Sequence, residues 1–199
     1  LEAHGMFASK EDMNEEFERA LAICDRWARL LCMDAFVVSR PVAFNKPVST
    51  KTIGFDVLLP NGKTIQAVMA YLQSQIFSKP YGVTFQDKGK KRAAEHVTFG
   101  ITERTIYTSL VIHTDDLGLR LPSVMAPEQL WIVCRDQTQL SQEIAEKLRQ
   151  ELRSKGIRAA IMPANSQSNL FEVMIKKGTP LQLVLDDAAL RKGTLEVFD

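Results

Sequence analysis

Apolar residues recur every three or four positions between Met13 and Leu31, with mostly charged and polar residues between them. That spacing places the apolar side chains on one face of a helix. Ser9 stands just before this stretch and Asp12 follows three residues later, the spacing of a reciprocal N-cap. The pattern predicts a helix over about residues 10–32, with its apolar face toward a core.

Short apolar runs predict several strands in the first half of the chain, at residues 35–38, 52–59, 63–70 and 95–99. Pro60-Asn61-Gly62 stands between the second and third of these runs. Asn and Gly tolerate the positive φ that a tight hairpin turn requires, so these two strands are expected to be antiparallel. Gly100 is expected to open a helix that runs to about His113.

A basic run, Lys88-Gly89-Lys90-Lys91-Arg92, predicts an exposed and mobile loop. Two interpretations of this run are open. It is either the solvated tip of a hairpin, which is the more common role of such a sequence, or a contact for phosphate groups.

The pattern changes after a stiff segment, residues 121–127, in which two prolines fix φ and interrupt backbone hydrogen bonding. Beyond it, apolar strands predicted at 130–133, 157–162, 181–185 and 194–198 alternate with helices predicted at 139–155 and 169–177. Gly156 and Gly178 follow these helices in the position that favours glycine. Such alternation predicts mostly parallel strands, and it divides the chain into domains 1–124 and 125–199.

Composition narrows the function classes. Lys and Arg number 25 against 24 Asp and Glu, so the net charge of +1 gives no overall attraction to nucleic acid or membranes. No apolar stretch is long enough for membrane insertion. The three cysteines and three histidines do not cluster, which predicts no metal site, no disulfide scaffold and a reducing, intracellular compartment. Because the chain begins with Leu1 and carries no secretory signal, we expect it to be processed or part of something longer.

Gly100 and Arg104 are the first candidates for ligand contact. A glycine between a strand and a helix lets a ligand approach the backbone, and an arginine one turn into the helix can hold phosphate oxygens in its planar fork. The alternative for Arg104 is a surface ion pair with Glu103 or Asp115. Asp115-Asp116 is itself either a metal site or, as is more common, a solvated turn.

Four motifs follow one another along the first domain. In chain order they are the segments 59–67 and 75–79, the run Phe99-Gly100-Ile101-Thr102-Glu103-Arg104, and the segment 113–122. In order and spacing they resemble the prolyl-tRNA synthetases of the archaeal and eukaryotic type, which are class II aminoacyl-tRNA synthetases. The resemblance covers nearly the whole chain. It implies an α/β protein: a truncated class II synthetase-like antiparallel sheet with helices, followed by a small anticodon-binding-like domain with a mixed sheet.

The resemblance also implies roles for particular residues. The family's arginine that matches Arg104 clamps ATP, so Gly100 and Arg104 would form a site for ATP with Mg²⁺. Gln66 and Tyr71 would face the aminoacyl site. The family's motif 1 and most of its motif 2 are expected upstream of this chain, which argues against a synthetase-type homodimer. The candidates for RNA contact in the second domain are Arg158, Lys176 and Lys177.

The sequence departs from the family at polar positions. Met69-Ala70-Tyr71 stands where the family has Thr-Ser-His, and the histidine of that triplet helps to form the proline pocket. Ile76 replaces an asparagine, and Glu95 replaces an aromatic residue. From Ala126 onward the chain has ten basic and ten acidic residues, so the second domain lacks the positive charge that drives nucleic-acid binding.

These departures favour a prolyl-tRNA synthetase-like module that is not catalytic by itself and needs no cofactor. It would serve as a protein- or RNA-binding subunit of a larger protein or ribonucleoprotein assembly, in the mitochondrion or the cytoplasm. The alternative is a fragment of an active proline–tRNA ligase, which makes prolyl adenylate from proline and ATP and charges tRNA. A divergent enzyme for another amino acid or acyl substrate is a third hypothesis.

Overall fold

The computed structural model describes residues 1–41, 48–162 and 176–198. Its contacts divide the chain into two compact units, Leu1–Ile112 and His113–Asp199. The domain boundary expected from the sequence, between residues 124 and 125, lies C-terminal to this division, so the proline-containing segment belongs to the second unit. Each unit is described by itself.

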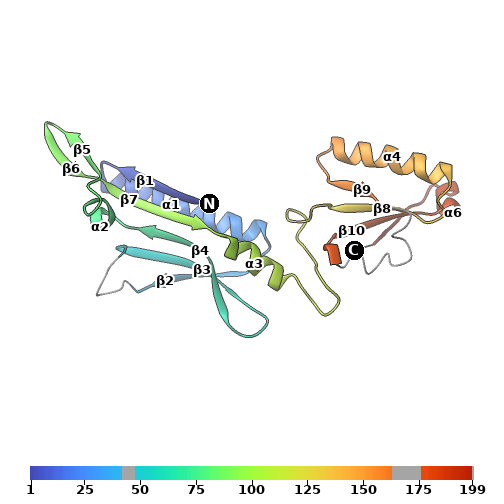
Figure 1. Ribbon diagram of the computed structural model, residues 1–199, viewed down its shortest axis with the longest axis horizontal. Coiled ribbons are helices and arrows are strands. Elements are labelled where there is room, and N and C mark those ends of the chain that lie inside the picture. The colour runs from blue at the N-terminus through green and yellow to red at the C-terminus, as the bar shows by residue number, and fades with distance from the viewer. Residues whose placement is uncertain (42–47, 163–175, 199) are drawn as a thin grey trace. The chain divides into compact units, whose positions relative to one another are not determined.

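The first unit is built on a five-stranded sheet with the order β1-β7-β4-β3-β2, in which all neighbouring strands are antiparallel (Figure 1). The strands span Glu2–Phe7 (β1), Ala35–Arg40 (β2), Lys51–Leu58 (β3), Thr64–Leu72 (β4) and Glu95–Ile101 (β7). The first strand in sequence therefore pairs with the last, which brings the start of the chain beside β7. This arrangement confirms the predicted antiparallel sheet.

Helix α1 (Lys10–Leu30) runs along the sheet beside β1 and β7 and packs on β4 and β7 (Figure 1). The Ser9 hydroxyl accepts a hydrogen bond from the Asp12 N–H at 3.1 Å, so the predicted N-cap is confirmed. The buried face of the helix consists of Met13, Phe17, Ala20, Cys24 and Ala28. Burial of a side chain as large as Phe17 contributes about 2 kcal/mol to the free energy of unfolding.

Two hairpins of this unit have short turns that follow local sequence signals. Between β3 and β4 the Leu59 N–H donates to the Lys63 carbonyl, and Gly62 takes a φ of 77°, as the Asn-Gly turn predicted. Strands β5 (Thr84–Asp87) and β6 (Lys90–Ala93) form a separate antiparallel pair. The basic run is therefore hairpin rather than loop for most of its length, because only Lys88 and Gly89 form the turn.

The expected start of the next helix is wrong. Gly100 lies within β7, where it pairs with Glu2 on one side and Met69 on the other. Helix α3 (Glu103–Ile112) begins only after this ladder ends, and Arg104 consequently lies in its first turn. A short helix, α2 (Gln75–Ser78), follows β4.

The second unit has a four-stranded sheet of order β11-β10-β8-β9. Strands β8 (Leu130–Cys134), β9 (Ala159–Ile161) and β10 (Leu181–Leu185) are parallel, whereas β11 (Glu196–Phe198) is antiparallel to β10. This mixed sheet confirms the prediction. Helices α4 (Gln139–Ser154) and α6 (Asp187–Arg191) complete the described elements, and the helix predicted at 169–177 lies mostly outside the described residues.

The core of this unit forms between α4 and the sheet. Ile132, Leu185, Ala145 and Ala159 have no exposed surface. Gly156 ends α4 with a φ of 81°, the left-handed conformation that glycine adopts without strain. Within the described ranges of both units, none of the helices is long and apolar enough to span a bilayer.

Candidate functional site

A cleft of about 390 Å³ opens in the first unit where β4, β7 and α3 meet. All four residues that the sequence assigned to nucleotide and substrate contact, Gln66, Tyr71, Gly100 and Arg104, line this cleft. Its other walls come from Leu1, Glu2, Ala67, Val68, Met69, Thr102 and Glu103. The strands β4 and β7 are neighbours, so residues that lie some 30 positions apart in sequence reach the same space.

Gly100 keeps one wall of the cleft open. An added Cβ at this position would meet no atom within 4 Å. A ligand group can therefore come close to the backbone there, and any larger residue would fill the space instead. The open wall is a consequence of the strand position of Gly100, not of the strand-to-helix junction that the sequence predicted.

Arg104 presents an exposed guanidinium at the edge of the cleft. The adjacent Thr105 hydroxyl donates to the Ala67 carbonyl at 2.8 Å, which fixes the first turn of α3 against β4. In the described part of the chain Arg104 has no ion-pair partner within 4 Å, and Asp115 instead pairs with Arg120 at 3.7 Å. The guanidinium is thus available to an anionic ligand.

Tyr71 occupies the position at which the sequence pattern of the family has histidine. Its side chain is half-buried, and burial together with the nearby Glu2 carboxylate raises the pKa of the phenol, although Arg40 and Arg104 oppose the shift. The hydroxyl stays protonated at neutral pH. Tyr71 can therefore donate or accept a hydrogen bond in the cleft, but it cannot serve as a base.

A polar cluster, buried except for His4, lies on the same face of the sheet as Tyr71. The register places His4 opposite Thr98, and Thr98 opposite Tyr71. The Thr98 hydroxyl donates to Gln73 Oε1 at 2.8 Å and lies 3.0 Å from His4 Nδ1 and 3.2 Å from His96 Nε2. These four side chains, His4, Gln73, His96 and Thr98, are called the histidine cluster below.

Three members of the histidine cluster, Gln73, His96 and Thr98, are buried, whereas the His4 side chain is 43% exposed. His96 is fully buried, and Thr98 is 3% exposed. The ring of Phe77 packs on His96 with 4.4 Å between centroids. Burial, with a smaller contribution from His4, lowers the pKa of His96 to about 4, so this imidazole is neutral at physiological pH. Sequence reasoning missed the cluster, because only the pairing of β1 with β7 brings His4 to His96.

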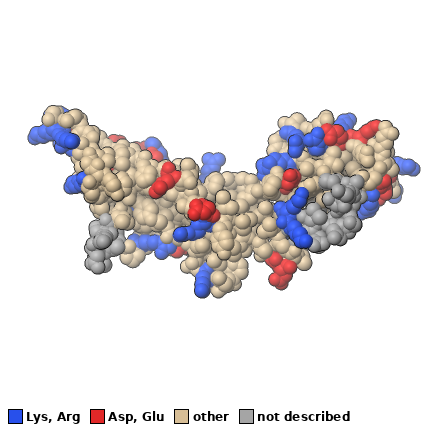
Figure 2. Space-filling model, in the orientation of Figure 1, with Lys and Arg blue, Asp and Glu red and all other residues tan. Residues whose placement is uncertain are grey.

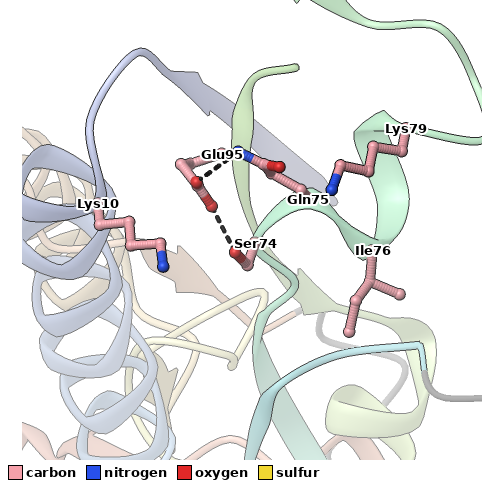
Figure 3. Close-up of a pocket in the computed structure, with 6 residues that line it drawn as sticks. All are labelled: Lys10, Ser74, Gln75, Ile76, Lys79 and Glu95. Atoms are coloured by element: carbon pink, nitrogen blue, oxygen red, sulfur yellow. Dashed lines mark hydrogen bonds between the residues drawn. The ribbon is translucent and has the colours of Figure 1, made fainter. Parts of the chain in front are cut away.

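A second pocket of about 300 Å³ lies at the N-terminal end of α1, next to α2. Its lining residues are Lys10, Ser74, Gln75, Ile76, Lys79 and Glu95 (Figure 3). The Glu95 carboxylate is 4% exposed, and it accepts hydrogen bonds from the Ser74 hydroxyl and from Gln75 Nε2, the latter at 2.9 Å. Glu95 therefore joins β7 to the segment around α2, and both of its oxygens are engaged.

Ser74 makes this connection from an unusual backbone conformation. Its φ of 52° and ψ of −139° belong to a region that glycine adopts with ease and other residues rarely adopt. The Gln73 and Ser74 N–H groups both donate to the His96 carbonyl, at 2.9 and 3.0 Å. These bonds hold Ser74 in place and direct its hydroxyl toward Glu95.

The candidate RNA contacts of the second unit differ in their surroundings. The Arg158 guanidinium donates to the carbonyls of Ser123, Val124 and Ala126 at 2.7 to 3.3 Å, so it holds the proline-containing segment. Lys177 Nζ lies 4.7 Å from the centre of the Trp131 ring. Lys176, the residue before Lys177, is exposed. The structure does not bring Arg158 to the two lysines through a described contact.

Asp115 belongs to a turn. Its Oδ1 accepts hydrogen bonds from the N–H groups of Leu117 and Gly118 at 2.8 and 3.1 Å, and these bonds lower the pKa of the carboxyl group. Among the residues that the structure describes, no three His, Cys, Asp or Glu side chains lie close enough together to hold a metal ion.

Known proteins resemble the chain along nearly its whole length. Residues 129–199 match the family model "Anticodon binding domain". The proline–tRNA ligase of Methanopyrus kandleri is 28% identical over 202 aligned positions, which cover 99% of this chain and 42% of that protein. The proline–tRNA ligase of Pyrococcus horikoshii is 32% identical over 162 positions, covering 79% of this chain and 34% of that protein.

Solved structures agree in fold. The prolyl-tRNA synthetase of Cryptosporidium parvum, solved with L-proline and AMP, superposes with a TM-score of 0.86 at 24% identity, over 98% of this chain and 44% of that one. The Giardia lamblia enzyme, solved with prolyl-adenylate, gives a TM-score of 0.83 at 24% identity. The chain thus spans less than half the length of the relatives that it matches.

The antiparallel sheet, the helix that follows it at Glu103 and the matched second unit define a class II aminoacyl-tRNA synthetase fold. Within that class, the chain is a homologue of the archaeal and eukaryotic prolyl-tRNA synthetases over most of its length.

Proposed function

We propose that this chain is part of a prolyl-tRNA synthetase-like protein that acts by binding RNA or protein within a larger assembly and does not activate proline by itself. The histidine cluster carries the proposal. It lies on the face of the sheet where the resemblance places the proline pocket, and its buried members, Gln73, His96 and Thr98, are engaged with one another.

A bound amino acid would have to compete with this cluster. The Thr98 hydroxyl already donates to Gln73 and lies within hydrogen-bond distance of both histidines. Each buried hydrogen bond that is broken without replacement costs about 1–3 kcal/mol. Bound proline could offset this loss only through contacts of its ring, its ammonium group and its carboxylate. The substitution of the family histidine by Tyr71 removes a further contact.

RNA is the favoured partner, because the second unit matches the anticodon-binding domain family. A tRNA is one such RNA. The equal numbers of acidic and basic residues after Ala126 leave that unit without a strong general attraction for phosphates, so its binding would depend on particular contacts. A protein partner is the alternative, supported by the exposed Phe36 and Val37 on the edge strand β2.

One observation favours a second candidate function, a fragment of a working proline–tRNA ligase. The cleft brings Gln66, Tyr71, Gly100 and Arg104 together as the resemblance implies. Arg104 would hold the phosphates of ATP, whose Mg²⁺ would neutralise the remaining charge, and Gln66 would face the aminoacyl group. The open wall at Gly100 and the available guanidinium both suit a nucleotide.

Calorimetry with ATP, with and without proline, separates these candidates. It should use the longest natural form of the protein, an Arg104→Ala variant and an Arg26→Ala control, since Arg26 is an exposed arginine on α1 that does not line the cleft. We expect no proline-dependent binding and no proline-dependent exchange of pyrophosphate into ATP. Binding that requires Arg104 but not Arg26, and that tightens with proline, would establish the ligase instead.

A further inference from the structure

The hairpin β5–β6 extends beyond the end of the main sheet (Figure 1). Its two-residue turn, Lys88-Gly89, has φ values of 49° and 75°, the left-handed pair that closes a tight hairpin. Asp87 pairs with Lys90 next to this turn, and Thr84 pairs with Ala93 at the base. The regular register makes the hairpin a defined arm and not a loose loop.

The arm is strongly basic. Lys88, Lys90, Lys91 and Arg92 are all exposed, and blue side chains gather at the end of the hairpin in Figure 2. The acidic residue of the arm, Asp87, pairs with Arg92 at 3.1 Å. The three lysines have no carboxylate within 4 Å among the described residues. Their charge is therefore not compensated within the arm.

More basic groups and an aromatic ring lie near the base of the arm. Gln75, which hydrogen-bonds to the Ala93 carbonyl at 3.5 Å, lines the second pocket together with Lys10 and Lys79 (Figure 3). Tyr81 is 72% exposed, and its ring stacks on Phe77 with 4.6 Å between centroids. Phe77 supports one side of the ring, while most of the Tyr81 side chain faces solvent.

We propose that this arm binds single-stranded RNA. Lys88, Lys90 and Lys91 contact phosphates of the RNA backbone, and a base stacks on the exposed ring of Tyr81. Lysine charge and an exposed aromatic ring are the two components that single-stranded nucleic acid requires, since every base offers a stacking face. The proposal rests on the binding role given above and assigns it a surface in the first unit.

The composition of the arm favours RNA over other anionic partners. Its one large apolar residue, Phe85, is half-buried, so the arm has no exposed apolar side chain to insert into a lipid surface. An acidic peptide would form ion pairs with the lysines, but it would provide no base to stack on the ring of Tyr81. The match of the second unit to an anticodon-binding family makes RNA the appropriate nucleic acid.

Fluorescence anisotropy with a labelled 20-nucleotide single-stranded RNA tests the arm in the longest natural form of the protein. The variant is Lys88→Ala/Lys90→Ala/Lys91→Ala. The control, Lys63→Ala/Lys147→Ala/Lys192→Ala, removes the same charge from exposed lysines elsewhere. Three lost phosphate contacts should weaken binding about a hundredfold at 0.1 M salt and reduce the slope of log affinity against log salt by about 2. The control should lose no more than a few-fold.

Tyr81 gives an independent test that does not alter charge. Tyr81→Ala should weaken binding about tenfold with an unchanged salt slope, and Tyr81→Phe should bind like the wild type. Equal losses in both lysine variants would overturn the proposal, as would an arm variant with wild-type affinity, which would leave RNA binding to the second unit. Arm-dependent binding to phosphatidylserine vesicles without RNA binding would also overturn it. None of these results depends on whether the protein binds ATP and proline, so this proposal and the absence of proline activation are tested separately.

Discussion

His4 and His96 lie 92 positions apart in sequence, yet their rings stack with 5.2 Å between centroids and 3.0 Å between His4 Nδ1 and His96 Nε2. Two imidazoles at this distance share one proton between their facing nitrogens, so at least one of the rings must be neutral. Burial makes His96 the neutral one. The pair therefore links the stability of the first unit to pH.

Stability should fall with acidification in a defined pH window. The pKa of His96 is lowered to about 4 in the folded protein, whereas an unfolded histidine titrates near its ordinary value of 6.5. Between these values the unfolded state binds a proton that the folded state does not. The contribution is thus complete above about pH 6.5 and is lost progressively toward pH 4, to the extent of about 3 kcal/mol. Urea unfolding at several pH values measures it.

His96→Gln is the matched variant for that measurement, because glutamine keeps a polar side chain but does not titrate in this range. Its free energy of unfolding should change less than that of the wild type between pH 6.5 and 4.5. Identical pH profiles for the two proteins would contradict the assignment of the effect to His96.

Thr98→Val should destabilise the first unit by about 1–3 kcal/mol. Valine has nearly the same shape as threonine but removes the hydroxyl that contacts His4, Gln73 and His96. Thr64→Val, at an exposed position, is the control and should stay within about 0.5 kcal/mol of the wild type. Chemical denaturation of both variants gives the difference, and equal effects would show that the hydroxyl contributes nothing.

The two small substitutions of Ser74 should have different effects. Ser74→Gly relieves the backbone strain at φ 52° but loses the hydrogen bond to Glu95, and the two changes should nearly cancel. Ser74→Ala loses the bond and keeps the strain, so it should be less stable than Ser74→Gly by about 1 kcal/mol. Thermal and urea unfolding compare them directly. If the alanine variant is the more stable of the two, the backbone conformation at position 74 is not strained.

Arg158→Lys should destabilise the second unit by about 1–2 kcal/mol, because an ammonium group cannot reach all the carbonyls that the guanidinium contacts. Arg191→Lys, at an exposed position on α6, is the control and should be nearly neutral. Hydrogen exchange of the amides in β8 and β9 reports the stability of this unit by itself. Unchanged exchange in Arg158→Lys would show that the contacts of Arg158 with the carbonyls do not stabilise this unit.

Local features of the fold were predictable from the sequence. The Ser9 cap, the Pro60-Asn61-Gly62 turn and the alternation of strands and helices after residue 129 depend on residues close together in the chain. The structure confirms the cap and the turn, and it confirms the alternation as far as the described residues extend. Gly100 shows where this approach fails. Its position suggested a helix start, but its backbone is bonded to β1 and β4, and those partners are far away in sequence.

The resemblance to the family identified the candidate residues of the cleft. It did not indicate how these residues are arranged in space. The sequence by itself determined the longer helices, most strands of the two main sheets, the two-part organisation and the identity of Gln66, Tyr71, Gly100 and Arg104 as candidates. Tertiary structure alone decided that these four share one cleft, that Arg158 is engaged with backbone carbonyls, and that His4 meets His96. The reason is physical: capping and turn formation are local, whereas strand register joins distant residues and sets which side chains share a face.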